Sequence, residues 1–542
     1  MLGSVGIVDA ETRGAGLCAN VAASVGVAAL ALAAYAGLSG HSFLLNWDDL
    51  EYVVENEAIR GLSWANLRAI FTRPYLANYA PLHILSYAVD HALWGLRPAG
   101  FLLTNVVLHA VNGILLYSLL ARLGTARAAA ALGAAFFVAS PVQVESVAWI
   151  SERKNVLCMT FFLLAVHAFV AYRSPASRHR AIAYLLGLAS GIAALLTKAA
   201  AVVLAPVLLL FDFCYVDVKA RRHWLVDKLP IAVATAAVVA ATVATQGEAI
   251  AAGQAAFALD GPTRVYTMAP VVVRYLGMVA WPFGLSPVYM PRVREVPDLA
   301  FWAAALVLLG AVALGVLLLR RRRKLFFWYA TFFVGLVPVL QIIPLPTLMN
   351  DRYLYFPMLG ASGFLALALE PLVTSARRAI RVGAVALGAA GVLALAMASH
   401  TRADVWRDDV SLWRDATAKV PKATLAWNGL GMSLVDAGRG VEALGAFQAA
   451  LALDPDYRLA LNNIGALYNR LGQPEAGRPY LLRAVALSPG NFGALMNLGI
   501  GYQMSGDWRT AAQAFHAAVA LRPWDAAATS RLREAEVRAA AQ

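Results

Sequence analysis

Four short groups of charged residues could do chemistry, and each stands beside a long apolar run. They are residues 46–52, with Asp48 and Asp49; Glu145 with Glu152, Arg153 and Lys154; Lys198; and residues 350–357, with Asp351 and Arg352. A carboxylate can take the proton of an acceptor hydroxyl. Arginine and lysine bind phosphate, arginine through two parallel hydrogen bonds. Together these residue types indicate transfer of a group from an anionic lipid carrier, with Asp48 or Asp49 as the base.

Each group also has a purely structural interpretation. The acid pair could lie in a solvated loop, with one aspartate capping a helix. The basic pair could simply neutralise Glu152, and Lys198 could reach along apolar surface to the membrane interface. The tyrosines of residues 350–357 are frequent at membrane interfaces, and Asp351 could pair with Arg352.

The elements that must position these groups are membrane helices. The chain is 60% hydrophobic and 14% charged, whereas soluble domains carry about 25% charged residues. A helix needs about 20 apolar residues to cross a bilayer. The sequence predicts eleven spans, near residues 17–38, 101–121, 128–147, 155–172, 181–197, 199–215, 230–247, 299–319, 325–343, 353–372 and 379–399.

The basic residues predict the orientation of these spans. The net charge of +13 gathers in clusters between spans, at residues 122–127, 173–180, 219–222, 320–324 and 377–381. A cytoplasmic N-terminus puts every cluster inside, as the positive-inside rule requires, if residues 79–95 and 266–283 lie in the outer interface instead of crossing. Their charged side chains would cost roughly 2.5–3.5 kcal/mol each in hydrocarbon. All four chemical groups then lie on the outer side, which also carries the outer loops 39–100 and 248–298, and no nucleic-acid partner is expected.

After about residue 400 the composition changes and a period of 34 residues begins. Prolines and glycines repeat at this spacing: Pro421, Pro455, Pro489 and Pro523; Gly431, Gly465 and Gly499; Gly438, Gly472 and Gly506. This pattern is typical of tetratricopeptide repeats, which are pairs of helices stacked into a solenoid. It predicts a membrane domain over 1–400, a helical adaptor over 401–420, three repeats near 424–457, 458–491 and 492–525, and a capping helix to residue 542.

Two asparagines of the repeats are candidates for binding an acceptor or a partner protein. Asn463 and Asn497 occupy equivalent positions, where their amides could bind an extended peptide backbone. Ordinary polarity of a helix surface explains them equally well. A second acid pair, Asp408 and Asp409, lies in the adaptor and is interpreted as a solvated helical face.

Several stretches of the membrane half resemble a known family. They are the outer acid pair and residues 79–87, 104–110, 140–148 and 352–357. Together with the repeats, they resemble the transmembrane and tetratricopeptide-repeat O-mannosyltransferases, within the C-type glycosyltransferases related to protein O-mannosyltransferase. The resemblance implies an all-α, polytopic helical membrane domain with an outward-facing active site, followed by the solenoid. It also implies a polyprenyl-phosphate sugar donor, with mannose as the sugar, inversion at the sugar carbon, and protein serine or threonine as acceptor.

The resemblance also assigns roles to single residues. Asp48 and Asp49 match the acidic motif of the first outer loop, Glu145 matches an acid of the second motif region, and Arg153 matches a basic position after it. With Lys154, Lys198 and Arg352, Arg153 is expected to bind the donor phosphate. Two positions depart from the family pattern. Ala199 follows Lys198 where the family often has glutamate, and residues 140–141 read Ser-Pro where it usually has His-Pro.

The prediction is therefore a membrane glycosyltransferase whose partners are a polyprenyl-phosphate sugar, an acceptor protein or glycan, and the bilayer. The alanine-, glycine- and arginine-rich composition suits a bacterium, which places the protein in the inner membrane with periplasmic repeats. No motif requires a cofactor, and a divalent cation such as Mg²⁺ or Mn²⁺ is left open. The alternatives are a repeat-bearing scaffold for envelope assembly without catalysis, a lipid-linked oligosaccharide ligase, and a transporter.

Overall fold

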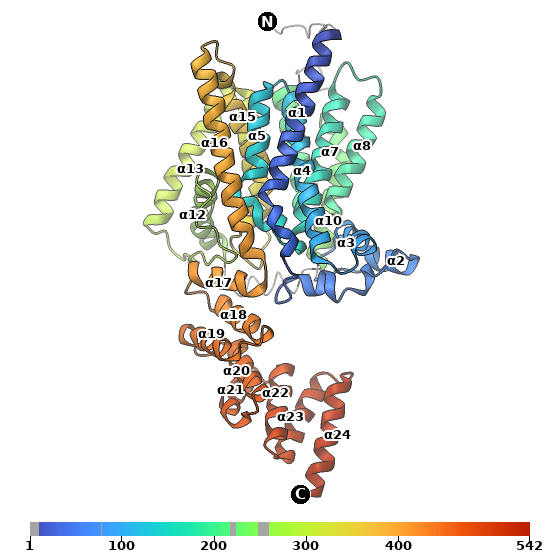
Figure 1. Cartoon of the computed structure of the whole chain (residues 1–542), viewed down its shortest axis with the longest axis vertical. Helices are drawn as coiled ribbons and strands as arrows, with labels where there is room; N and C mark the ends of the chain where they lie inside the picture. Colours follow the sequence, from blue (N-terminus) through green and yellow to red (C-terminus); the bar gives the residue numbers. More distant parts are fainter. Residues whose placement is uncertain (1–9, 77, 217–223, 246, 248–258) are drawn as a thin grey trace. The chain divides into compact units, whose positions relative to one another are not determined.

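The computed structural model describes residues 10–76, 78–216, 224–245, 247 and 259–542. Two compact units divide the chain, Met1–Asp408 and Asp409–Gln542. Both are helical, as Figure 1 shows. In the described part of the chain, the extended backbone pairs only at an isolated bridge between Tyr75 and Asn78.

The first unit is a bundle of helices with irregular segments at its ends. The helices are α1 (Ala10–Ala34), α2 (Trp64–Thr72), α3 (Pro81–Trp94), α4 (Pro98–Arg122), α5 (Arg127–Ala139), α6 (Val144–Ala148), α7 (Arg153–Arg173), α8 (Arg180–Leu195), α9 (Leu204–Tyr215), α10 (Leu229–Thr245), α12 (Gly261–Ala280), α13 (Leu299–Arg321), α14 (Arg323–Leu336), α15 (Pro357–Val373) and α16 (Arg378–Ala403). Short 3-10 turns precede several of them, including Ile150–Glu152 before α7 and Asp351–Leu354 before α15.

Five helices among the described residues are long and apolar enough to cross a membrane. They are Pro98–Arg122, Ile150–Arg173, Val226–Thr245, Leu299–Arg321 and Arg378–Trp406, and a sixth candidate is the pair Arg127–Ala139 and Pro141–Ala148, bent by 49°. The other predicted spans coincide with shorter apolar helical stretches, Cys18–Ala34 within α1, Arg180–Leu195, Ala199–Tyr215 and Pro357–Val373, and with α14. The number eleven therefore stays a prediction. The stretches expected to lie in the interface form α3 and α12, neither of which is among the candidate spans.

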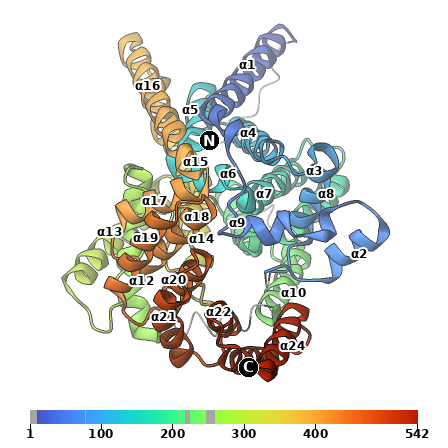
Figure 2. The ribbon, with the colours of Figure 1, turned by 60° about the horizontal axis from the view of Figure 1, so that its bottom comes forward.

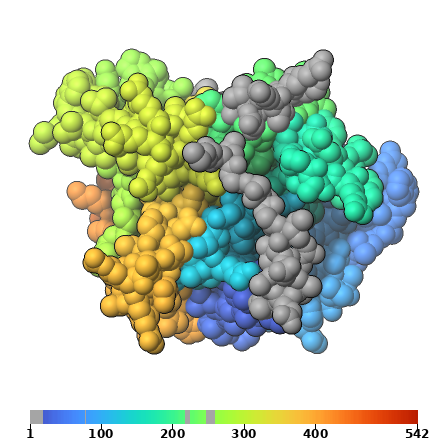
Figure 3. Space-filling model, turned by 90° about the horizontal axis from the view of Figure 1, so that it is seen from above, coloured from blue at the N-terminus to red at the C-terminus, as the bar shows by residue number. Residues whose placement is uncertain are grey.

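Basic turns gather at the end of this unit where α1 begins. The turns α4–α5, α7–α8, α13–α14 and α15–α16 lie there in Figure 1, and Figure 3 views the same end. Lys324, at the start of α14, lies beside Gly124, in the α4–α5 turn. The predicted cluster at 219–222 lies outside the described residues. The Asp48 loop follows α1 and so lies at the other end, which Figure 2 brings forward.

The second unit consists of successive helix pairs. It contains α17 (Asp409–Lys419), α18 (Thr424–Asp436), α19 (Gly440–Leu453), α20 (Arg458–Arg470), α21 (Pro474–Leu487), α22 (Phe492–Met504), α23 (Trp508–Leu521) and α24 (Ala526–Ala541). Residues 401–408 of the predicted adaptor belong to the first unit, and the rest of it forms α17.

Packing explains the 34-residue period of the glycines. A Cβ atom at Gly431, Gly465 or Gly499 would lie 2.3–2.5 Å from Phe447, Leu481 or Phe515, the side chain that faces it from the second helix of its pair. Only glycine therefore lets the two helices approach so closely. The glycines at 438, 472 and 506 have φ of +73°, +75° and +79° and end the first helix of each pair.

Candidate functional site

Asp49 joins the loop after α1 to the segment before α7. Its carboxylate is buried, with the residue 1% exposed. One oxygen accepts a hydrogen bond from the Leu44 amide at 3.0 Å. The other accepts from the Ser151 amide at 3.0 Å and from the Ser151 hydroxyl. Burial raises the pKa of Asp49 to about 6, although these three hydrogen bonds act to lower it.

The neighbouring Asp48 is only half-buried. Partial burial raises the pKa of Asp48 above its ordinary value, while the charges of Lys154 and Arg352 act to lower it. The two adjacent acids thus have different surroundings. Asp49 accepts hydrogen bonds from backbone amides and a hydroxyl in the interior, whereas Asp48 faces a group of cations. The sequence left open which acid is the base, and this difference favours Asp48.

The cations belong to a cluster built from segments far apart in the chain. The Glu152 carboxylate lies 3.1 Å from Lys154 Nζ, 3.3 Å from Lys198 Nζ and 3.5 Å from Arg352 Nε. Arg352 Nη1 also contacts Glu145 Oε1 at 2.5 Å, and the Arg352 amide donates to Glu145 Oε2 at 2.8 Å. Glu145 and Arg352 are 207 residues apart. The structure therefore brings three of the four predicted groups into direct contact, and the fourth joins them through the charges around Asp48.

Exposure differs systematically within this cluster. The Glu145 and Glu152 side chains are 1% exposed, whereas those of Lys154, Lys198 and Arg352 are 15%, 22% and 14% exposed. Three cations thus lie over two buried carboxylates, with Asp48 beside them, and the cations are the more accessible charges. Such an arrangement can bind an anion such as phosphate through charge-assisted hydrogen bonds.

Asn155 orients the cluster and was missed in the sequence. Its side-chain amide donates to Ser146 Oγ and Glu152 Oε2, both at 2.9 Å, and its carbonyl oxygen accepts from Lys198 Nζ at 2.7 Å. The same amide lies 3.4 Å from the backbone oxygen of Arg352. The only signal in the sequence is a polar residue within an apolar stretch, which does not reveal its partners.

Arg153 does not lie at this surface with the other predicted phosphate ligands, and its binding of the donor stays an untested prediction. Its side chain is 0% exposed and forms an ion pair with Asp90 at 2.5 Å. Its Nε donates to Asn105 Oδ1 at 2.7 Å, and its Nη2 donates to the Phe101 carbonyl at 2.6 Å. Successive residues of a helix point about 100° apart. Because Arg153 and Lys154 both start α7, only one of them can face the cluster, and Arg153 instead links α7 to α3 and α4.

An aromatic group stands beside the cluster. Trp149 and Trp406 stack with ring centroids 5.6 Å apart, and Trp47 lies 5.0 Å from Trp149. The Arg352 guanidinium lies 5.4 Å from the Trp149 ring. Trp47 immediately precedes Asp48, so these rings adjoin both the cations and the loop of residues 41–55, called the acid loop below.

The two predicted asparagines of the repeats contact other asparagines. Asn463 Nδ2 donates to Asn428 Oδ1 at 3.0 Å, and Asn497 Nδ2 donates to Asn462 Oδ1 at 2.9 Å. Each bond joins the first helices of successive repeats, and the side chains are partly buried. Part of their hydrogen-bonding capacity therefore stabilises the stacking of the repeats. Their binding of an acceptor stays a prediction.

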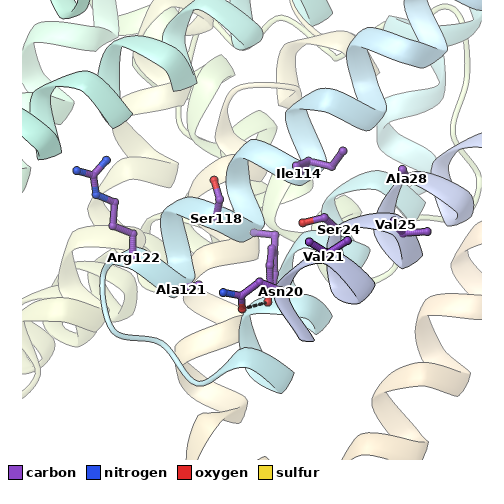
Figure 4. Close-up of a pocket in the computed structure, with 10 residues that line it drawn as sticks. Asn20, Val21, Ser24, Val25, Ala28, Ile114, Ser118, Ala121 and Arg122 are labelled. Carbon is purple, nitrogen blue, oxygen red and sulfur yellow. Dashed lines mark hydrogen bonds between the residues drawn. The ribbon is translucent and has the colours of Figure 1, made fainter. Parts of the chain in front are cut away.

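Metal binding and cavities give no further support to this site. Within the described ranges, no three His, Cys, Asp or Glu side chains are grouped so that they could hold a metal ion. A cavity of about 530 Å³ lies between α1 and α4, where Asn20 bonds to Tyr117 (Figure 4). It is lined by Ser24, Ser118 and Arg122 among others, and by none of the predicted site residues.

Comparison with known proteins finds tetratricopeptide repeats in this chain and partial similarity to protein O-mannosyl-transferases. The family model described as "Tetratricopeptide repeat" matches residues 410–458 and 428–492. The protein O-mannosyl-transferase TMTC1 of Mus musculus is 34% identical over 136 residues, which cover 23% of this chain and 14% of the relative. TMTC2 of Mus musculus is 36% identical over 98 residues, which cover 18% of this chain and 12% of the relative. Tmtc1 of Drosophila melanogaster is 26% identical over 191 residues, covering 34% and 22%.

These matches are partial, because they span between 12% and 22% of the relatives' own lengths. Among solved structures, that of MamA from Desulfovibrio magneticus RS-1 covers 24% of this chain and 73% of its own at 22% identity. Its TM-score is 0.23. The predicted resemblance is nonetheless confirmed: over part of its length, this chain is similar to the protein O-mannosyltransferases of the TMTC group.

Proposed function

We propose that this protein is a membrane glycosyltransferase that moves a sugar, mannose by its resemblance, from a polyprenyl phosphate to an acceptor hydroxyl. The acceptor is a serine or threonine of a protein, and transfer occurs on the non-cytoplasmic side of the membrane. The observation that carries this proposal is the cluster in which Lys154, Lys198 and Arg352 lie over Glu145 and Glu152 beside Asp48. The repeats then bind the acceptor or a partner protein.

The reaction is a single displacement at the anomeric carbon. The acceptor oxygen forms a bond to that carbon as the bond from the carbon to the phosphate oxygen breaks. Asp48 takes the proton of the acceptor hydroxyl. The electron pair of the broken bond leaves with the polyprenyl phosphate, whose added charge is stabilised by Lys154, Lys198 and Arg352. Attack from the side opposite the phosphate inverts the configuration of the sugar carbon.

Two of the residues predicted to be catalytic take positioning roles in this scheme. Glu145 accepts from both the side chain and the backbone amide of Arg352, so it sets where the guanidinium lies. Asp49 holds the acid loop against Ser151. Arg153 has no contact with the donor, because its guanidinium is buried among α3, α4 and α7.

Purified Asp48→Asn tests the proposal. We expect sugar transfer from a polyprenyl-phosphate mannose to a serine- and threonine-containing peptide to fall by roughly 10²–10⁴-fold, the usual contribution of a general base. Glu55→Gln is the matched control, because Glu55 is an exposed carboxylate of the same loop. A folded Asp48→Asn protein that transfers sugar as fast as Glu55→Gln would remove Asp48 from the mechanism.

A further inference from the structure

The last segment of the first unit, residues 402–407, touches both parts of the candidate site. It comprises the end of α16, the short turn Asp404–Trp406 and Arg407; Asp408 then ends the first unit, and the second unit begins at Asp409. The Arg407 carbonyl accepts hydrogen bonds from the Ser42 amide at 2.9 Å and from the Ser42 hydroxyl at 3.2 Å. The start of the acid loop is thereby joined to residues far along the chain.

Trp406 adds an apolar contact to the same loop. It is 1% exposed. Its ring stacks on Trp149 at an interplanar angle of 19° and lies 6.3 Å from Trp47. Trp47 precedes Asp48, and Trp149 stands two residues before Ser151, which donates to Asp49. Trp406 therefore packs against both segments that Asp49 joins.

Arg402 contacts the turn that carries Arg352. Its Nη2 lies 3.6 Å from Asp351 Oδ2, and Asp351 immediately precedes Arg352. Asp351 also accepts from the Tyr289 hydroxyl, which ties this turn to the loop after α12. One segment of six residues thus contacts the acid loop, the segment before α7 and the turn that carries Arg352.

We propose that residues 402–407 are a positioning segment that fixes Asp48 relative to Arg352. Asp48 lies in a loop, not in a long helix, so its place depends on such tertiary contacts. A misplacement of 1 Å can cost a reaction about 100-fold. The kinetic consequence of this proposal rests on the proposed glycosyl transfer, whereas its structural consequence does not.

The test compares Trp406→Leu with Trp406→Phe, which keeps an aromatic ring, and with Phe169→Leu. Phe169 is equally buried at 1% but lies near the C-terminal end of α7, away from the site residues at the start of that helix, so its loss controls for general destabilisation. Hydrogen exchange is measured in detergent on peptides covering residues 42–52 and 149–152. We expect Trp406→Leu to exchange at least about 10-fold faster there than either other variant, because exchange follows local opening.

The kinetic test measures kcat and the KM for donor separately. We expect Trp406→Leu to lower kcat roughly 10- to 100-fold with little change in the KM for donor, and Trp406→Phe to recover most of it. If Trp406→Leu does not fold, Arg402→Met replaces it, with exchange followed over residues 350–354. Exchange like that of Phe169→Leu at these peptides would overturn the proposal. Faster exchange in a protein whose wild type transfers no sugar would instead overturn the proposed function and leave the positioning segment intact.

Discussion

At the scale of single residues, burial separates two neighbouring acids. Asp49 has both oxygens engaged by Leu44 and Ser151 in the interior, and Asp48 remains at the edge of a cationic surface. A buried carboxylate that must keep three donors satisfied is poorly placed to exchange protons with an acceptor. Asp48 is accessible and can exchange a proton with an acceptor, and the charges of Lys154 and Arg352 act to lower its pKa.

The pH dependence of transfer should report this environment. Asp48 works as a base only when ionised, so transfer should fall as pH drops through its pKa, which burial raises above 3.8. Lys154 acts to lower that pKa. Replacing it by Lys154→Gln should therefore move the acid limb of the kcat profile to higher pH. The measurement is kcat against pH with saturating donor.

Lys198→Gln is the matched control for that experiment. Lys198 contacts Glu152 and Asn155 but is not among the groups that shift the pKa of Asp48. The Lys198→Gln variant should raise the KM for donor, because a phosphate contact is lost, and should leave the acid limb of the kcat profile in place. An acid limb that stays at the wild-type pH in Lys154→Gln would show that Asp48 is not the titrating base.

At the scale of elements, close packing of α14 on α15 fixes the turn that carries Arg352. That turn, Asp351–Leu354, leads directly into α15 at Pro357. A Cβ atom at Gly360 of α15 would lie 2.2 Å from the Phe332 backbone nitrogen, and one at Gly363 would lie 2.1 Å from the Trp328 ring. The absence of side chains at these two positions lets the helices approach and so helps to place Arg352.

Gly360→Ala should therefore destabilise the protein by about 1–3 kcal/mol, the usual cost of overpacking. Gly383→Ala, in α16, is the control, because no atom lies within 4 Å of its Cβ position. It should be neutral or gain up to about 1 kcal/mol, since alanine favours helix more than glycine. Thermal unfolding in detergent measures both, and equal midpoints for the two variants would contradict the packing argument.

At the scale of the whole molecule, the membrane half separates charges between its two ends. The described basic turns lie at the end where α1 begins (Figure 1). The acid loop and the cation cluster beside it lie at the end where α1 finishes. The positive-inside bias favours the cytoplasm for the first end. Under the proposed function, the second end faces the compartment that holds the acceptor.

Cysteine labelling in intact cells tests this orientation. In a protein whose Cys18, Cys158 and Cys214 are replaced by serine, we expect Glu55→Cys to react with a membrane-impermeant maleimide before lysis. Arg377→Cys, in the basic α15–α16 turn, should react only after lysis. Both positions are exposed. Labelling of both before lysis would place the two ends on one side of the membrane and contradict the topology.

The sequence by itself determined the features that depend on local pattern. Apolar runs predicted where the helices lie, because a helix in lipid must be apolar along most of its length. The 34-residue period predicted the repeats, because each pair of helices needs glycine where Gly431, Gly465 and Gly499 meet a large side chain. The resemblance to the O-mannosyltransferases also came from short motifs that the chain shows directly.

Only the tertiary structure decided which of the candidate charges meet. The pairing of Glu145 with Arg352 crosses 207 residues, and no periodicity encodes such a contact. Arg153 and Lys154 are adjacent and chemically alike, yet the angular step of a helix buries one and leaves the other at the surface. Asn155 and Trp406 contact site residues that belong to other helices and segments. These contacts depend on side-chain direction and long-range packing, which local sequence does not specify.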